Sequence, residues 1–204
     1  VREWAGVNPQ TGAPQWWIDN THAEKTGTYN SAKQQIVGSA TPKAFGSFGS
    51  TFSYKGISLD FLFYYNFGNL VRDTWANYTQ SDGYNATFNR VAAQLNRWQK
   101  PGDITNVPKY VYGGANASNS FSSRYLYEGD YIRLRDVSLG YTLPSNIVSK
   151  VKLSNVKIYV RGSNLWTWVK DKNLPYDPET AINSSTNLDI YLPKTFTGGL
   201  QVAF

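Results

Sequence analysis

Three carboxylates in one predicted loop raise the question of catalysis. Asp171, Asp177 and Glu179 lie close together in the sequence, and a glycosidase needs two such groups placed across the bond that it cleaves. However, Asp177 stands in the run PYDP, which is typical of a turn, and carboxylates in loops are usually solvated turn formers. We therefore expect no catalytic residue and no enzymatic activity.

The sequence lacks the residues that metal sites and nucleophilic catalysis usually require. The 204 residues contain no cysteine and a single histidine, His22, which excludes disulfides and Cys-type zinc sites and disfavours His-based metal sites and Ser-His-Asp catalysis. Gly113 and Gly114 lack the strand-to-helix context of a phosphate-binding loop. We expect no metal site and no cofactor.

Aromatic side chains are the remaining candidates for ligand contact. Aromatic residues make up 16% of the chain and charged residues only 17%, against about 25% charged residues in a typical soluble domain. Loop packing or an aromatic girdle also explains them, so no substrate-binding residue is assigned. The residues that could stack on sugar rings are Trp16, Trp17, Trp98, Tyr110 and Tyr112.

The positive charge does not indicate a nucleic-acid partner. The net charge is +6, but the lysines and arginines are scattered singly along the chain. A nucleic-acid-binding protein gathers them in a patch or along one helix face. We therefore expect no nucleic-acid binding.

Alternation of apolar and polar residues predicts that strands position all of these residues. The segments are about as long as the ~9–11 residues that cross a bilayer as a tilted strand, and no apolar run approaches the ~18 residues of a membrane helix. Lys55-Gly56 predicts a two-residue hairpin turn. A weaker strand is expected around Trp16 and Trp17, and a helix over Ala86–Gln99. The main predicted strands are 45–54, 57–67, 131–144, 155–168 and 195–204.

The segment Tyr131–Pro144 changes its phase of alternation. Val137, Leu139 and Tyr141 share one face, whereas the preceding apolar residues fall on the opposite phase and alternate with Arg133 and Arg135. A charge that faces lipid at mid-depth costs about 2–4 kcal/mol. The pattern therefore predicts a bulge before Val137, or a rim region where the strand leaves the membrane, with the arginines in the rim or the lumen of a barrel.

Short and long connections alternate along the predicted strands, which places all the long loops at one end of the sheet. Outer-membrane barrels have this plan, with short periplasmic turns, long extracellular loops and a C-terminus on the periplasmic side. A girdle of aromatic residues is expected toward the long-loop ends, formed by Tyr64, Tyr65, Trp166 and Trp168. A soluble β-sandwich, which would bury the apolar faces in a core, remains the alternative from pattern alone.

Six blocks of the sequence, in order, resemble the C-terminal part of the SusC/RagA family, the TonB-dependent outer-membrane transporters of Bacteroidetes. The blocks spread over nearly the whole chain. They are GSATPKAFGSFGSTFSYKGISLDFLFYYNFGN from Gly38, RWQKPGD from Arg97, YIRLRDVSLGYTLP from Tyr131, VKIYVRGSNLWTW from Val156, YDPE from Tyr176 and LPKTFTGGLQVAF from Leu192.

The resemblance implies an all-β fold, an antiparallel transmembrane barrel of 22 strands plugged by an N-terminal domain. Residues 1–204 would form about the last six strands, with the plug and the earlier strands outside this sequence. It also implies import of oligosaccharides or peptides across the outer membrane, with a SusD-like lipoprotein as a lid and energy from TonB. Because the chain begins with Val1 and contains no Met, we interpret it as a processed chain or a fragment.

The last strand carries a further expectation of the family. Outer-membrane barrels end in an alternating strand with a terminal aromatic residue, which the barrel-assembly machinery reads. Leu200, Val202 and Phe204 fit this signal. Two alternative functions remain open, a secreted carbohydrate-binding β-sandwich and a passive porin-like channel.

Overall fold

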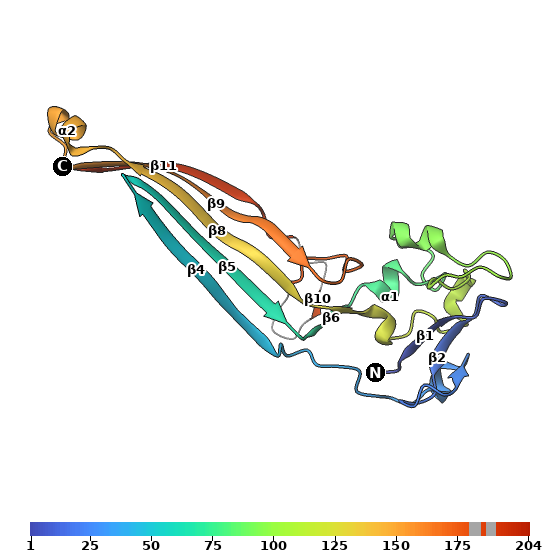
Figure 1. The fold of residues 1–204 in the computed structure, drawn as a ribbon. Coiled ribbons are helices and arrows are strands. Elements are labelled where there is room, and N and C mark those ends of the chain that lie inside the picture. The colour runs from blue at the N-terminus through green and yellow to red at the C-terminus, as the bar shows by residue number, and fades with distance from the viewer. Residues whose placement is uncertain (180–184, 187–190) are drawn as a thin grey trace. The chain divides into compact units, whose positions relative to one another are not determined.

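The computed structural model describes residues 1–179, 185–186 and 191–204, and its contacts divide the chain into two compact units (Figure 1). The sheet unit comprises residues 41–69, 128–179 and 189–204. The loop unit comprises residues 1–40, 70–127 and 180–188. Each unit is described by itself.

The sheet unit is built on one antiparallel sheet of five strands in the order β11-β9-β8-β5-β4 (Figure 1). All five main predicted strands are therefore confirmed. The sheet has one strand fewer than the approximate number implied by the resemblance, and the weaker candidate around Trp16 and Trp17 forms part of another sheet. The strands are β4 (Ala44–Tyr54), β5 (Ile57–Phe67), β8 (Tyr131–Thr142), β9 (Asn155–Val169) and β11 (Thr195–Ala203).

The short connections and the C-terminus lie at the same end of this sheet (Figure 1). Lys55 and Gly56 have φ angles of 47° and 86°, so the predicted two-residue hairpin turn is confirmed, with both central residues in the left-handed region that its geometry requires. The link from β8 to β9 contains α2 (Ser145–Val148) and the 3₁₀ helix Ser149–Val151. The long connections therefore leave the sheet at its other end.

One face of the sheet is apolar on all five strands, and we call it the apolar face. The register places the alternating apolar residues of neighbouring strands side by side, as in Phe61↔Val137 and Ile158↔Leu200. These side chains stay exposed: Phe48 at 63%, Val160 at 58% and Leu200 at 63%. A contiguous exposed apolar surface that extends over five strands marks a membrane or protein contact. Separately, no helix in the described part of the chain has the length and apolarity to span a membrane.

The predicted bulge in β8 is confirmed at Arg135. On the β5 side, Leu62 pairs with Asp136 and Phe63 with Leu134, so Arg135 has no opposite residue. On the β9 side, the register shifts over the same positions. The extra residue reverses the alternation, which explains why the apolar positions are even-numbered before the bulge and odd-numbered after it.

The loop unit contains two small three-stranded sheets. The first has the order β1-β2-β3, and the second has the order β10-β6-β7. One short helical turn follows β3, and the others lie between β6 and β7. The strands are β1 (Trp4–Val7), β2 (Pro14–Trp17), β3 (Lys25–Thr26), β6 (Leu70–Asp73), β7 (Leu126–Glu128) and β10 (Ser185–Thr186), and the helices are α1 (Ala76–Thr79) and the 3₁₀ turns Tyr29–Ser31, Ala92–Asn96, Tyr112–Gly114 and Ser123–Tyr125.

A buried ion pair lies at the centre of the loop unit. Arg124 donates to both carboxylate oxygens of Asp82, with its Nη2 3.1 Å from Oδ1, and both side chains are almost fully buried. The hydroxyl of Tyr125 donates to the carbonyl of Ser118 at 3.2 Å. Burial raises the pKa of the Tyr125 phenol well above its ordinary value. These polar contacts fix the long connection between β5 and β8.

The predicted helix over Ala86–Gln99 is wrong. Only the 3₁₀ turn Ala92–Asn96 forms there, and Val91 and Arg97 on either side of it are extended. Leu95, which was expected on the apolar stripe, is 74% exposed. Most of the stability of a short helix comes from packing of its apolar face, and Phe88, Ala92 and Leu95 of this stripe are exposed in the described structure.

Candidate functional site

The polar face of the five-stranded sheet carries its charged groups. We define it as the face opposite the apolar face. The register aligns one residue from each strand in a row across it. This polar row consists of Thr51, Asp60, Ser138, Arg161 and Thr197.

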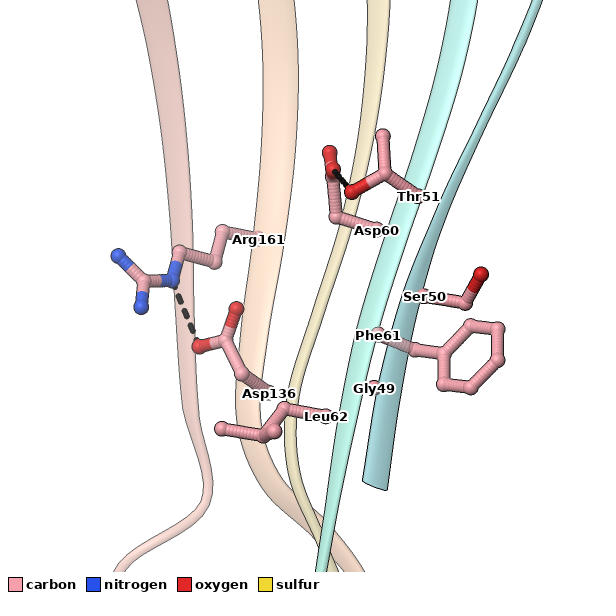
Figure 2. Close-up of a pocket in the computed structure, with 8 residues that line it drawn as sticks. All are labelled: Gly49, Ser50, Thr51, Asp60, Phe61, Leu62, Asp136 and Arg161. Carbon is pink, nitrogen blue, oxygen red and sulfur yellow. Dashed lines mark hydrogen bonds and ion pairs between the residues drawn. The ribbon is translucent and has the colours of Figure 1, made fainter. Parts of the chain in front are cut away.

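A hollow of about 520 Å³ lies along the polar row and the adjacent positions (Figure 2). In it, Thr51 donates from Oγ1 to Oδ1 of Asp60 at 2.7 Å. Arg161 donates from Nε to Oδ2 of Asp136 at 2.6 Å, and Asp136 also accepts from the hydroxyl of Ser163 at 3.1 Å. The side chains of Arg161 and Asp136 approach each other, and the side chains of Thr51 and Asp60 form a second pair (Figure 2).

The hollow can offer both a carboxylate and a guanidinium to one ligand. Asp60 and Arg161 lie in the same row with the small Ser138 between them, which corresponds to roughly 10 Å across two strand spacings. The side chain of Arg161 is more than half exposed. The hollow therefore presents hydrogen-bond donors and acceptors of both charges to a polar solute.

A second charged cluster lies toward the long-connection end of the sheet. Arg133 forms an ion pair with Asp177, and Arg135 donates from Nη2 to Oε1 of Glu179 at 2.6 Å. Arg133 pairs across the sheet with Tyr64, and the guanidinium of Arg135 lies 5.3 Å from the centre of the Tyr64 ring. Both arginines are thus on the polar face and not on the apolar face, which agrees with the prediction that they avoid lipid.

Asp177 ties several segments together. Its Oδ1 accepts from Arg133 and from the backbone N–H of Glu179 at 2.9 Å, and its Oδ2 accepts from the N–H of Leu192 at 3.3 Å. The residue therefore attaches both the outgoing and the returning part of the connection between β9 and β11 to β8. The prediction that it is a solvated turn former is wrong, because Asp177 is buried by its charged partner.

The other two loop carboxylates have different environments. Asp171 accepts from the N–H of Asn173 at 2.9 Å, which is the turn-forming role predicted for it. Glu179 is half-buried against the two arginines. Within the described residues, no group of three or more His, Cys, Asp or Glu side chains is placed to hold a metal ion.

The aromatic candidates divide by exposure. Trp16 is fully buried, with its ring edge-on to Trp4 and Tyr29, so it cannot stack on a sugar. Tyr110 and Tyr112 are exposed on the loop unit. Trp17 and Trp98 are half-buried.

The girdle prediction is correct in position for Trp166 and Trp168, which are exposed on the apolar face and pair with Leu134 and Ile132. Tyr65 also pairs with Ile132 on that face. Tyr64 is wrong as a girdle residue: it faces the polar side, where its ring lies 6.0 Å from that of Tyr131.

The terminal residues are placed on one side of β11. Leu200 and Val202 pair with Ile158 and Val156 of β9, so both belong to the apolar face. Phe204 follows the strand with its side chain exposed, and its carbonyl accepts from the hydroxyl of Ser154 at 3.2 Å. Their predicted role as an assembly signal stays a prediction.

Together, an exposed apolar face, a charged opposite face and alternating connection lengths define the wall of an outer-membrane β-barrel. Comparison with known proteins agrees. No family model matches the chain. TonB-dependent receptor P3 of Formosa agariphila is 29% identical over 187 residues, covering 87% of this chain and 18% of the receptor. TonB-dependent receptor P39 of the same organism is 32% identical over 122 residues, covering 59% of this chain and 12% of the receptor.

Solved structures cover the chain from end to end. The RagAB peptide importer in its open-open state superposes with a TM-score of 0.85 at 27% identity, covering 100% of this chain and 22% of the matched chain. Its closed-closed state gives a TM-score of 0.84. The resemblance to the SusC/RagA family is confirmed, and the sheet is part of an outer-membrane barrel of Gram-negative Bacteroidetes type. The chain spans between 12% and 22% of the length of these proteins.

Proposed function

We propose that this chain is the C-terminal part of the barrel of an active outer-membrane importer of oligosaccharides or peptides. One observation carries the proposal. The sheet has the apolar and polar faces of a membrane-spanning wall, and the whole of this chain superposes on part of a peptide importer. The relatives are receptors and transporters, so we propose transport and no enzymatic activity.

The domain arrangement and the partners belong to the same proposal. Residues 1–204 would close the barrel at its C-terminal end, with a plug domain and earlier strands elsewhere in a longer protein. The partners would be a SusD-like surface lipoprotein as lid, TonB as the source of energy and the barrel-assembly machinery. The match to RagAB structures supports the lid, and the name TonB-dependent receptor in the relatives supports the coupling.

The two alternative functions differ in what the structure supports. A secreted β-sandwich would bury the apolar face in its core, whereas the side chains of this face are widely exposed. A passive porin-like channel has the same kind of wall as an importer. The need for energy separates it from the proposed function.

Uptake by cells tests the proposal. The full-length gene is deleted, and growth and uptake are measured on a panel of oligosaccharides and peptides as sole nutrients, with and without dissipation of the inner-membrane proton gradient. We expect loss of uptake of at least one nutrient in the deletion strain, and the same loss in the wild type after the gradient is dissipated. Uptake that survives dissipation would favour the porin, and a protein found in the soluble fraction would overturn both.

A further inference from the structure

The second charged cluster contains two ion pairs with unequal exposure. Arg133 and Asp177 are 2% and 7% exposed, whereas Arg135 and Glu179 are 32% and 30% exposed. The inner pair is thus closed to solvent, and the outer pair is in contact with it. A solute that moves along the polar face can reach Arg135 without disturbing Asp177.

The hydrogen bonds of the outer pair are incomplete. Glu179 bonds Arg135 through Oε1, but its Oε2 is 3.6 Å from Nε of Arg133, which is beyond hydrogen-bond distance. Among the described residues, neither that Nε nor that Oε2 has a hydrogen-bond partner. Glu179 therefore lies between two guanidinium groups and satisfies only one of them well, which makes it a replaceable partner.

The guanidinium of Arg135 has a second contact besides Glu179. The bulge makes Arg135 an extra residue in β8, and its guanidinium lies over the ring of Tyr64, 5.3 Å from the ring centre. Arginine stacks on aromatic rings through its flat face and leaves its N–H groups directed outward in the plane. Tyr64 would thus still support the planar group that recognises a carboxylate when Glu179 leaves.

From this geometry we infer that Arg135, supported by Tyr64, is a binding site for carboxylate groups on the polar face, and that Glu179 of the chain occupies it in this structure. Solutes that carry a carboxylate exchange with Glu179 for the same guanidinium. The site selects for anionic substrates, such as peptides with a free C-terminus or acidic sugars. Selection during transport rests on the proposed function, whereas the binding itself does not.

Two substitutions that break the same ion pair test the inference, because they act in opposite directions. Glu179→Gln removes the resident carboxylate and leaves Arg135 available. Arg135→Gln removes the site. Binding of glutarate, with the uncharged glutaramide as reference, is measured by saturation-transfer NMR on the full-length transporter in detergent, which requires no energised uptake.

We expect glutarate to bind Glu179→Gln about two- to fivefold more tightly than wild type, which is the range of one partly exposed ion pair. Binding should be lost in Arg135→Gln, and glutaramide should not bind. The matched controls are Glu128→Gln and Lys170→Gln, which break an exposed ion pair of 2.9 Å in the same unit and should leave glutarate binding unchanged. All variants are first checked for folding by the heat-dependent shift of the barrel on a denaturing gel.

Three outcomes overturn the inference: weaker or equal glutarate binding in Glu179→Gln, unchanged binding in Arg135→Gln, or equal binding of glutaramide. If Arg135→Gln does not fold, the first and third outcomes still decide. Glutarate binding with the expected order of variants, but no uptake of any nutrient, would retain the site and overturn the importer.

Discussion

Arg133 and Asp177 form an almost fully buried ion pair between residues 44 positions apart in the sequence. Arg133 belongs to β8, and Asp177 belongs to the connection that follows β9. Burial of two charges is costly, and their attraction offsets this cost only when both partners are present. The pair therefore holds the connection on the polar face in a way that depends on both residues.

The first prediction is that losing one partner harms the protein more than losing both. Asp177→Leu leaves the guanidinium of Arg133 buried with only the more distant Glu179, and we expect a loss of about 3 kcal/mol of stability. The double variant Arg133→Met with Asp177→Leu should recover most of that loss. The midpoint temperature of unfolding of each variant is measured by the heat-dependent gel shift of the full-length barrel. A double variant as unstable as Asp177→Leu would contradict this account.

A second prediction concerns the assignment of the two faces. Val160 lies in the middle of the apolar face, paired with Leu139 and Gly198. Val160→Arg should cost about 2–4 kcal/mol, because the charge then faces lipid at mid-depth. Tyr159→Arg, at the adjacent position on the polar face, is the matched control and should assemble normally. The measured quantity is the fraction of folded barrel in the outer membrane. Equal fractions for the two variants would contradict the assignment of the apolar face to lipid.

The turn between β4 and β5 gives a third prediction. Gly56 has a φ of +86°, and a Cβ there would approach the carbonyl oxygen of Thr142 to 2.7 Å. Gly56→Val should therefore lower stability by more than about 1 kcal/mol. Lys55→Asn should have little effect or a slight stabilising one, because Asn-Gly is favoured in this turn type. The midpoint temperature of unfolding is measured for each variant by the same gel shift. An unchanged midpoint for Gly56→Val would show that a side chain at this position does not strain the turn.

Most of the sheet was predictable from the sequence because its signals are local. Period-2 alternation is a property of each strand and gives its two faces directly. The only further choice is which of the two faces contacts lipid. The bulge at Arg135 was predictable for the same reason, since one extra residue reverses the alternation within a few positions. The Lys55-Gly56 turn is likewise set by two adjacent residues.

Contacts between distant residues were not predictable in this way. Nothing near Asp177 in the sequence shows that a buried arginine of β8 is its partner. The sequence therefore predicts a solvated carboxylate in a loop, which is wrong. Two opposite charge pairs, RLR in β8 and DPE after β9, are the signal that could have suggested it. The helix expected over Ala86–Gln99 failed because helical spacing alone does not supply a surface for the apolar stripe to cover.

The last prediction concerns the proposed assembly signal at the end of β11. Leu200 and Val202 lie on the apolar face, and Phe204 continues the same alternation with an exposed ring. Because this ring is exposed in the described structure, Phe204→Ala should leave the stability of the assembled barrel within about 0.5 kcal/mol of wild type but should lower the amount that reaches the outer membrane. Phe204→Tyr keeps a terminal aromatic residue and should assemble as wild type. Folded barrel in outer-membrane fractions is quantified after a short pulse of expression, and gel-shift midpoints are measured on the assembled protein. A lower midpoint with normal assembly would make Phe204 a structural residue, whereas slow assembly with a normal midpoint is the result that a recognition signal requires.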